Sequence, residues 1–298
     1  MNCAIIGYGS IGKRHYKILK KNKFFKNIYV VSKTGNNRNF FKNISDILDK
    51  QIEYFVISNE TKDHYKTFRV IEKNFSGKKI LIEKPAFHKS ITLNKKLKNV
   101  YYVGYNLRFN PAVNYAKKII KNKKIFYMDM HCKTFMPNWR KNRDYTQIYS
   151  SFKKKGGGVL NDLSHELDLM YYFFGDYKLY SGFSKKISNL KIDSDDVSFF
   201  FGRFKKKIFF NVNLNFFSRI ESRKFIIASN DLHVEVDLIR NRLIISKKNL
   251  KKFINLKNVR NNDYLEMHKN ILFKKGSNAC SLKVANLTMK KIESIKNL

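Results

Sequence analysis

Residues 2–12 of the chain read NCAIIGYGSIG, in which a short apolar run is followed by three glycines spaced as GxGxxG. The run at 2–6 is typical of a buried parallel strand, and a helix is predicted at 11–21. In such a strand–turn–helix unit, Gly7 permits the tight turn, Gly9 lets the backbone approach a pyrophosphate, and Gly12 allows close helix–strand packing. The first helical residues, Ser10 and Ile11, present unpaired N–H groups to phosphates. This stretch therefore predicts a dinucleotide-binding domain.

The first hundred residues repeat this alternation of short apolar runs and amphipathic stretches. Further strands are predicted at 28–31, 53–57, 80–82 and 100–103, and further helices at 45–50, 62–74 and 90–97. Ser45 and Ser90 are candidate helix N-caps. Alternating strands and helices imply right-handed crossovers, so we expect a doubly wound parallel sheet of the Rossmann type.

The pattern changes after residue 105. A helix from Pro111 to 121, a long strand at 124–135 and a polar, aromatic loop at 137–155 precede a helix at 160–174. Alternating strands then follow one another at 197–204, 207–216 and 233–238, which indicates an antiparallel sheet. Helices at 264–274 and 281–296 close the chain. We therefore expect an α/β protein with a Rossmann domain at 1–105 and an α+β domain with a large, mostly antiparallel sheet at 106–298.

The residues after the second strand bear on cofactor choice. NAD-specific sites usually carry an acidic residue there, about 20 residues after the glycines. This chain has Ser32 and Lys33 instead, and both side chains can donate to a ribose 2′-phosphate. The pattern favours NADP over NAD. The alternative is that one lysine carries no information in a chain with 61 lysines and arginines.

The formal net charge of +38 raises the question of a polyanionic partner. Lysines run along the whole chain, and no helix-turn-helix, zinc-finger or RNA-recognition pattern is present. A nucleic-acid-binding protein is therefore a minor alternative, and the positive field is expected to attract anionic substrates and cofactors. No apolar run approaches the ~20 residues of a membrane helix. The lack of a basic leader and the three widely spaced cysteines predict a cytoplasmic protein.

Four further motifs accompany the glycine turn. They are Asn59 to His64, Glu83-Lys84-Pro85, GYNLRFNP at 104–111 and GGGVLNDLSHELD at 156–168. Together with GxGxxGxxH at 7–15, they make the chain resemble the glucose–fructose oxidoreductase / inositol dehydrogenase / MocA family over essentially its whole length. The resemblance implies an NAD(P)-dependent dehydrogenase or reductase acting on CH–OH groups of a sugar, cyclitol or nucleotide-sugar.

The resemblance also implies roles for single residues. Asn59, His64, Glu83 and Lys84 would lie beside the cofactor. Lys84 and His165 would flank the substrate hydroxyl, whose proton must be taken up as the carbonyl forms. A lysine near a cationic nicotinamide ring has its ammonium form disfavoured, which suits that task.

The partner of His165 is left open by the sequence. Asp162 precedes His165 by three residues, so on a continuous helix the two share a face and the carboxylate can orient the imidazole. Typical members of the family space the two residues by four, which places Asn161 in that position instead. Both remain candidates, with Asp162 as the predicted catalytic residue.

Substrate contacts are expected from two segments. Asn106 and Arg108 follow the last Rossmann strand, where such folds bind ligands. Trp139 and Tyr145 belong to a loop that mixes aromatic rings, hydroxyls and arginines, as carbohydrate recognition requires; an ordinary surface loop is the alternative. The loop resembles a subgroup that accompanies surface-polysaccharide and acidic-sugar gene sets. No metal site is expected.

The hypothesis is thus a sugar-directed NAD(P)-dependent oxidoreductase that forms a dimer or tetramer. Family members commonly associate through the second-domain sheet, and the aromatic strands at 197–204 and 207–216 have few helices to cover both faces. The alternative from another class is a regulator that binds NAD(P) without turnover. Retention of Lys84 and His165 speaks against that alternative.

Overall fold

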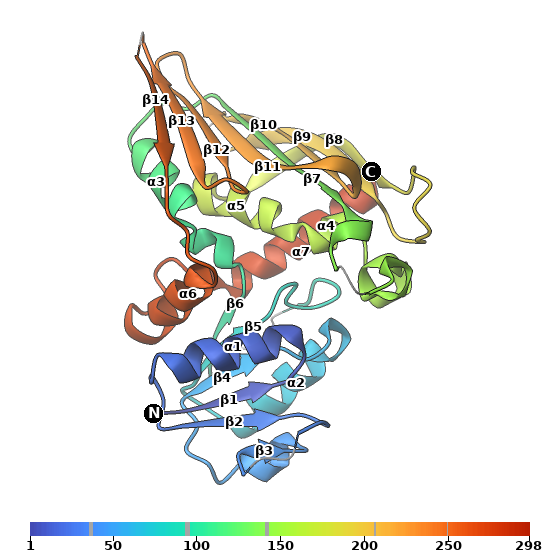
Figure 1. The fold of residues 1–298 in the computed structure, drawn as a ribbon, viewed down its shortest axis with the longest axis vertical. Helices are drawn as coiled ribbons and strands as arrows, with labels where there is room; N and C mark the ends of the chain where they lie inside the picture. The colour runs from blue at the N-terminus through green and yellow to red at the C-terminus, as the bar shows by residue number, and fades with distance from the viewer. Residues whose placement is uncertain (36–37, 93–95, 141–142, 206, 249) are drawn as a thin grey trace. The chain divides into compact units, whose positions relative to one another are not determined.

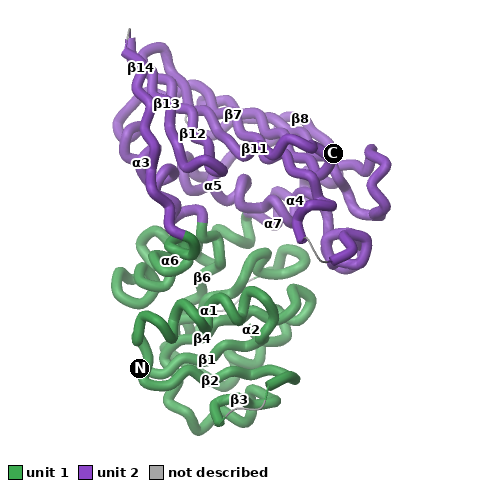
Figure 2. The backbone as a smooth tube through the Cα atoms, in the orientation of Figure 1, with its two compact units in different colours: residues 1–106, 260–287 green, residues 107–259, 288–298 purple. Residues whose placement is uncertain are grey.

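The chain folds into two compact units in the computed structural model, which describes residues 1–35, 38–92, 96–140, 143–205, 207–248 and 250–298 (Figure 1). Unit 1 comprises residues 1–106 and 260–287, and unit 2 comprises residues 107–259 and 288–298, as coloured in Figure 2. A segment near the C-terminus therefore belongs to the first unit, which a linear boundary near residue 105 does not anticipate.

Unit 1 contains a seven-stranded sheet in the order β15-β6-β5-β4-β1-β2-β3. Its strands β1 to β6 pair in parallel, and β15 pairs antiparallel with β6. The strands are β1 (Asn2–Ile6), β2 (Asn27–Val31), β3 (Phe40–Phe41), β4 (Tyr54–Ile57), β5 (Lys79–Ile82), β6 (Val100–Val103) and β15 (Cys280–Ser281). This is the predicted doubly wound Rossmann sheet, and all of β4 is buried because both faces of the sheet are covered.

The helices of unit 1 differ from prediction in two places. The elements are α1 (Ser10–Lys21), η1 (Ile44–Ile47), α2 (Thr61–Asn74), α6 (Asn262–Phe273) and the start of α7 (Leu282–Lys296). The predicted helix at 45–50 is a short 3-10 turn whose N-cap is Asn43, not Ser45, with the Asn43 N–H donating to Asp46 at 2.9 Å. The predicted helix at 90–97 is wrong for 90–92 and 96–97, which are not helical, and 93–95 lie outside the described residues.

Unit 2 contains an eight-stranded sheet in the order β14-β13-β12-β11-β7-β10-β9-β8. The pairing is antiparallel as predicted, except between β7 and β10, which are parallel. The strands are β7 (Tyr127–Phe135), β8 (Tyr177–Lys185), β9 (Val197–Phe204), β10 (Phe209–Asn215), β11 (Phe217–Ala228), β12 (His233–Asp237), β13 (Arg242–Lys247) and β14 (Leu250–Asn255).

Helices cover one face of this second sheet (Figure 1). Phe173 and Phe174 of α5 pack against Phe225 and Phe204 of the strands, with the rings tilted. The elements are η2 (Asn106–Phe109), which begins at the last residue of unit 1, α3 (Pro111–Ile119), four 3-10 turns at 136–138, 145–147, 149–151 and 153–155, α4 (Val159–Asp162), α5 (Ser164–Phe174) and the end of α7.

The helix predicted at 160–174 is present but is not continuous. Leu163, with φ −96° and ψ 29°, interrupts it and separates α4 from α5. Asp162 and His165 therefore lie on two helices, and their spacing no longer implies a shared helical face.

In the part of the chain that the structure describes, no helix is long and apolar enough to cross a membrane.

Candidate functional site

The carboxyl ends of five strands of unit 1 lie in register. Ile6 pairs with Val31 and Ile57, Ile57 pairs with Ile82, and Ile82 pairs with Val103. The residues that follow these strands therefore share one edge of the sheet, where open α/β folds bind their ligands. They are Gly7, Ser32, Asn59, Glu83-Lys84 and Asn106, all predicted site residues.

The glycine turn has the three properties that its spacing predicts. Gly7 has φ +94°, and a Cβ there would lie 2.4 Å from the Asn59 backbone N. A Cβ on Gly12 would lie 2.1 Å from the Gly7 carbonyl oxygen, so helix and turn pack as closely as backbone allows. Gly9 differs, because no described heavy atom lies within 4 Å of its ideal Cβ position. The space beside Gly9 is therefore open to a ligand.

The N-terminus of α1 faces the same space. Gly9 is the N-cap residue and supplies no side-chain cap, and Ser10 and Ile11 form the first turn. The turn contains no acidic residue. Exposed N–H groups at a helix N-terminus carry partial positive charge and bind phosphate oxygens.

The loop after β2 carries donors and no carboxylate at 32–35. The Thr34 N–H donates to Ser32 Oγ at 3.3 Å, which orders the start of the loop, and Lys33 is exposed. These residues have the chemistry to bind a phosphate group at this strand end.

Asn59 and His64 join two loops of the same edge. The Asn59 amide donates to Thr67 at 2.9 Å, and its buried Oδ1 has no hydrogen-bond partner among the described residues. His64 is buried, with Nε2 3.1 Å from the Asn59 carbonyl oxygen and Nδ1 3.1 Å from that of Ala86. Burial lowers the pKa of His64 and outweighs the opposing effect of the facing backbone carbonyls. A neutral ring has a single N–H, so it donates to only one of these two backbones at a time. The structure gives His64 a loop-joining contact, and its contact with a cofactor stays a prediction.

Glu83 and Lys84 follow β5 and have different surroundings. Glu83 is buried, and its Oε1 lies 2.8 Å from Nε2 of His15, the histidine of the opening motif. Its Oε2 accepts the Lys84 backbone N–H at 3.2 Å. The Lys84 side chain is half-buried, and the peptide bond to Pro85 is cis.

In unit 2, the two candidate partners of His165, Asn161 and Asp162, make different hydrogen bonds. The Asn161 amide donates to the Gly156 carbonyl oxygen at 2.8 Å and so holds the glycine run. Asp162 is buried and accepts a hydrogen bond from the Tyr149 hydroxyl. Desolvation, followed by the Asp162 charge, raises the pKa of Tyr149 well above its usual value. Asp162 is thus a buried carboxylate with Tyr149 as a contact that the sequence did not indicate, and its partnership with His165 stays a prediction.

The glycine run ahead of α4 is required by close packing. A Cβ on Gly157 would lie 2.3 Å from the Ser150 carbonyl oxygen, and one on Gly158 would lie 2.2 Å from Asp195 Oδ1. Gly158 also has φ +117°. These glycines place α4, and the Asp162 side chain at its end, against the loop that carries Tyr149.

Arg108 lies in a buried ion pair. Its Nε and Nη2 donate to the two carboxylate oxygens of Asp168 at 2.8 and 2.7 Å. The guanidinium lies over the Tyr172 ring, which Lys117 also contacts. Burial, followed by the Arg108 charge, lowers the pKa of Lys117 to about 8. Arg108 is thus paired with Asp168 in the protein core. Its contact with a substrate stays a prediction, and so does that of the buried Asn106.

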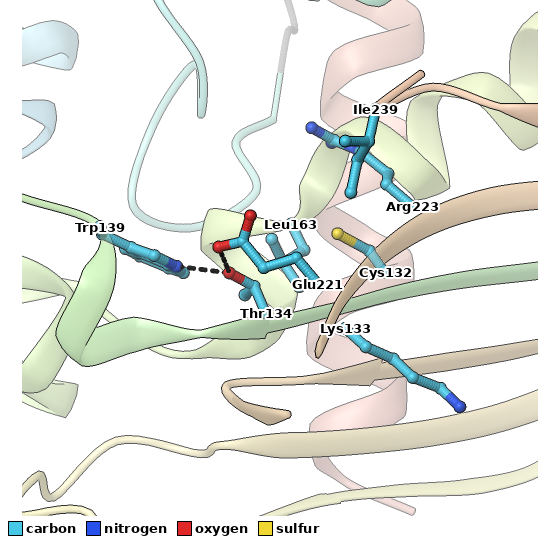
Figure 3. A pocket seen from close by; sticks show the side chains of 8 residues that line it. All are labelled: Cys132, Lys133, Thr134, Trp139, Leu163, Glu221, Arg223 and Ile239. Carbon is cyan, nitrogen blue, oxygen red and sulfur yellow. Dashed lines mark hydrogen bonds between the residues drawn. The ribbon is translucent and has the colours of Figure 1, made fainter. Parts of the chain in front are cut away.

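A cavity of about 260 Å³ lies in unit 2 beside the Leu163 interruption (Figure 3). The Trp139 Nε1–H donates to Thr134 Oγ1 at 2.7 Å, and Thr134 Oγ1 donates to Glu221 Oε1 at 3.3 Å. Arg223 is held by two hydrogen bonds to buried Glu166, at 2.6 and 3.0 Å. The lining residues are Cys132, Lys133, Thr134, Trp139, Leu163, Glu221, Arg223 and Ile239.

This cavity is lined by Trp139 of the predicted substrate loop, and not by Tyr145 of the same loop. Tyr145 lies in a 3-10 turn, where its hydroxyl accepts the Lys191 N–H at 3.2 Å. Sequence reasoning missed Thr134 and Glu221, because they meet where the pairing of β7 and β11 is irregular, between Phe217 and Ser222. The alternation of buried and less buried residues along β7 was the sequence signal that could have indicated Thr134.

The described residues contain no group of three or more His, Cys, Asp or Glu side chains placed to hold a metal ion.

Comparisons with known proteins place this geometry in context. No family model matches the chain, and no curated protein does. Solved structures match over nearly the whole length. Levoglucosan dehydrogenase in complex with NADH has a TM-score of 0.83 at 16% identity, covering 99% of this chain and 95% of that one. UDP-N-acetylglucosamine 3-dehydrogenase from Acidithiobacillus ferrooxidans has a TM-score of 0.78 at 16% identity, covering 99% and 96%.

A third structure is an oxidoreductase from Agrobacterium radiobacter in complex with NAD+, L-tartaric acid and magnesium. It has a TM-score of 0.80 at 14% identity and covers 98% of this chain and 94% of that one. The chain therefore has the fold of these oxidoreductases, which agrees with the resemblance of its motifs to the glucose–fructose oxidoreductase / inositol dehydrogenase / MocA family.

Proposed function

We propose that this chain, built on the sugar-oxidoreductase fold, is an NAD(P)-dependent enzyme that transfers a hydride to or from a hydroxyl-bearing or carbonyl carbon of a sugar-like substrate. The observation that carries the proposal is the open space at Gly9, at the uncapped N-terminus of α1 and at the shared carboxyl edge of five parallel strands. Backbone N–H groups there would hold the cofactor pyrophosphate.

The bound nicotinamide would supply hydride exchange, and the chain's own residues would handle the proton. Lys84 is the proposed proton acceptor during alcohol oxidation, because it follows β5 at the ligand-binding edge. His165 is the proposed second substrate contact. Asp162, the proposed third member, would stabilise a protonated imidazole or orient a substrate hydroxyl.

The cavity beside Leu163 supports a carbohydrate-like substrate. An indole, a carboxylate and a hydroxyl line it together at Trp139, Glu221 and Thr134. Aromatic faces pack on the C–H faces of sugar rings, while paired donors and acceptors suit vicinal hydroxyls. The solved relatives named above act on or contain sugars and related polyhydroxy compounds, which agrees with this class.

NADP is the proposed preferred cofactor. Ser32 and exposed Lys33 stand where an NAD-specific site carries an acidic residue, and both can donate to a 2′-phosphate.

The outer face of the unit 2 sheet is the proposed oligomer interface. In-register positions of neighbouring strands expose Tyr127, Phe201 and Phe209, each 37–51% exposed. Asn211 and Asn213 of β10 share this face, and each has a buried Oδ1 with no partner among the described residues. A second copy would cover the rings and supply these missing donors. A monomeric mass by light scattering at micromolar concentration contradicts this assembly.

The experiment for the function is a panel of free sugars, cyclitols and nucleotide-sugars offered with NAD+ and NADP+, monitored by absorbance of the reduced cofactor. We expect turnover of at least one polyhydroxy class and a raised KM in Trp139→Ala on the same substrate. Cofactor binding without turnover of any panel member would favour the regulator instead. For either function we propose a cytoplasmic location.

A further inference from the structure

A chain of four buried polar side chains runs through unit 1 and ends at the Glu83-Lys84 segment. The Tyr54 hydroxyl of β4 lies 2.8 Å from Nδ1 of His268 in α6. His268 Nε2 lies 2.9 Å from Nδ1 of His15 in α1, and His15 Nε2 lies 2.8 Å from Glu83 Oε1. Tyr54, His15 and His268 are each 0% exposed. The chain joins three elements that are far apart in sequence.

One proton arrangement satisfies every contact without a buried imidazolium. Burial lowers the pKa of His268 well below its usual value, so this ring is neutral and has a single N–H. Tyr54 O–H then donates to His268 Nδ1, His268 Nε2–H donates to His15 Nδ1, and His15 Nε2–H donates to Glu83 Oε1. The direction is the same at each step and ends on the Glu83 side chain, and hydrogen bonds in such a chain polarise one another.

Glu83 is enclosed at the end of this chain. Its second oxygen accepts the Lys84 backbone N–H at 3.2 Å, and a Cβ on Gly104 would lie 2.8 Å from Oε1. Other neighbours of the chain include the Tyr264 ring, edge-on to His15, the Arg14 guanidinium over that ring, and the Phe25 ring stacked on Tyr54. A glycine at 104 leaves room for the carboxylate, and the carboxylate contacts the backbone of the proposed proton acceptor.

Buried polar groups cost folding free energy unless all are paired, and an apolar core needs none of them. We propose that Tyr54, His268 and His15 form a positioning relay that holds the Glu83 carboxylate against the backbone of Lys84, and so fixes the placement of Lys84. Only the expected effect of the relay on the rate of hydride transfer rests on the proposed function. The three residues act through Glu83 and are positioning residues.

The test compares Tyr54→Phe and His268→Phe with the wild type. A matched control is Tyr101→Phe, which removes a hydroxyl that donates to Glu72 at 2.7 Å from the adjacent part of the same sheet, outside the relay. Three quantities are measured in each protein: hydrogen exchange of the Lys84 amide, NAD(P)H affinity, and single-turnover hydride transfer with a substrate from the panel.

We expect Lys84 amide exchange to be at least tenfold faster in both relay variants, and hydride transfer to be slower by about 10- to 100-fold, since a misplacement of ~1 Å costs about 10²-fold. Cofactor affinity should stay within about threefold, because no relay residue belongs to the glycine turn. His268→Gln, whose amide keeps one donor and one acceptor, should recover much of both losses. Tyr101→Phe should change neither quantity.

Unchanged Lys84 exchange in Tyr54→Phe and His268→Phe overturns the relay, and so does an equal change in Tyr101→Phe. Absence of hydride transfer in the wild type contradicts the proposed function instead, and Lys84 exchange still decides the relay. Should a variant fail to fold, ¹⁵N spectra of the wild-type histidine rings decide: Nε2–H on both His15 and His268 supports the relay, and Nδ1–H or a charged ring on either one refutes it.

Discussion

Arg108 donates two hydrogen bonds to Asp168, Nε to Oδ2 at 2.8 Å and Nη2 to Oδ1 at 2.7 Å, with both side chains buried. Both residues belong to unit 2, where the pair joins η2 to α5. Two parallel hydrogen bonds between planar groups define orientation as well as distance. The arginine that follows the last Rossmann strand therefore anchors the helix that carries His165.

Removing Arg108 should cost stability, because Asp168 would stay buried without its counter-ion. We expect Arg108→Leu to lower the free energy of unfolding by about 3–5 kcal/mol. Lys62→Leu, which breaks an exposed pair with Glu60, should cost far less, because water screens exposed ion pairs. Urea denaturation followed by circular dichroism measures both. Equal losses in the two variants would remove the special role of the Arg108–Asp168 pair.

Gly9 and Gly12 should respond differently to a side chain. Gly9→Val places methyl groups in open space at an ordinary φ of −71°, so the fold should persist while pyrophosphate approach is blocked. We expect the melting temperature without ligand to stay near that of the wild type and the stabilisation by NAD(P)H to vanish; at 100 times Kd, the wild type should gain about 2.7 kcal/mol. Gly12→Val should instead lower the melting temperature itself. Undiminished NAD(P)H binding by Gly9→Val shows that the turn is misinterpreted.

Lys33 should discriminate between the two nicotinamide cofactors. A charged hydrogen bond contributes about 1.5–3 kcal/mol, so Lys33→Ala should weaken NADPH binding about tenfold or more. NADH binding should be nearly unchanged. Lys20→Ala removes the same charge from the opposite end of α1 and serves as the control. Isothermal titration with both cofactors measures the effect, and equal losses for NADH and NADPH in Lys33→Ala argue against 2′-phosphate recognition.

Buried histidines should make unit 1 sensitive to acid. Burial lowers the pKa of His64 and lowers that of His268 further below the usual 6.5. Below pH 6.5 the unfolded chain binds protons that the folded chain does not, so stability should fall as pH falls through this range. His268→Gln removes one such group, so its melting temperature should decline less steeply between neutral pH and pH 5. Parallel declines would mean that other groups govern acid unfolding.

Much of the fold could be predicted from periodicity. β1 and β6 have their predicted bounds, because short apolar runs between glycines and polar residues have few alternatives in an alternating βα pattern. The helix at 90–97 is predicted from a serine N-cap and the spacing of apolar residues, but residues 90–92 and 96–97 are not helical. Tertiary contacts override such weak local signals.

The place of a candidate residue in the fold could be predicted where its motif lies at a strand end, and less so where distant chain segments meet. The glycine turn and the Glu83-Lys84 segment belong to the first class. His268 belongs to the second, because residues 260–287 return to unit 1 and place it between Tyr54 and His15. The interruption at Leu163 was also hidden, since an unbroken apolar period runs across it.

The central claim is that Lys84 and His165 act on the substrate and not on cofactor binding. The most direct measurement is single-turnover hydride transfer by Lys84→Ala and His165→Ala with a substrate identified in the panel, alongside the thermal shift with NAD(P)H. A proton-transfer residue contributes about 10²–10⁴-fold, so each variant should lose rate on that order while keeping the thermal shift. Near wild-type rates in both variants would contradict the account.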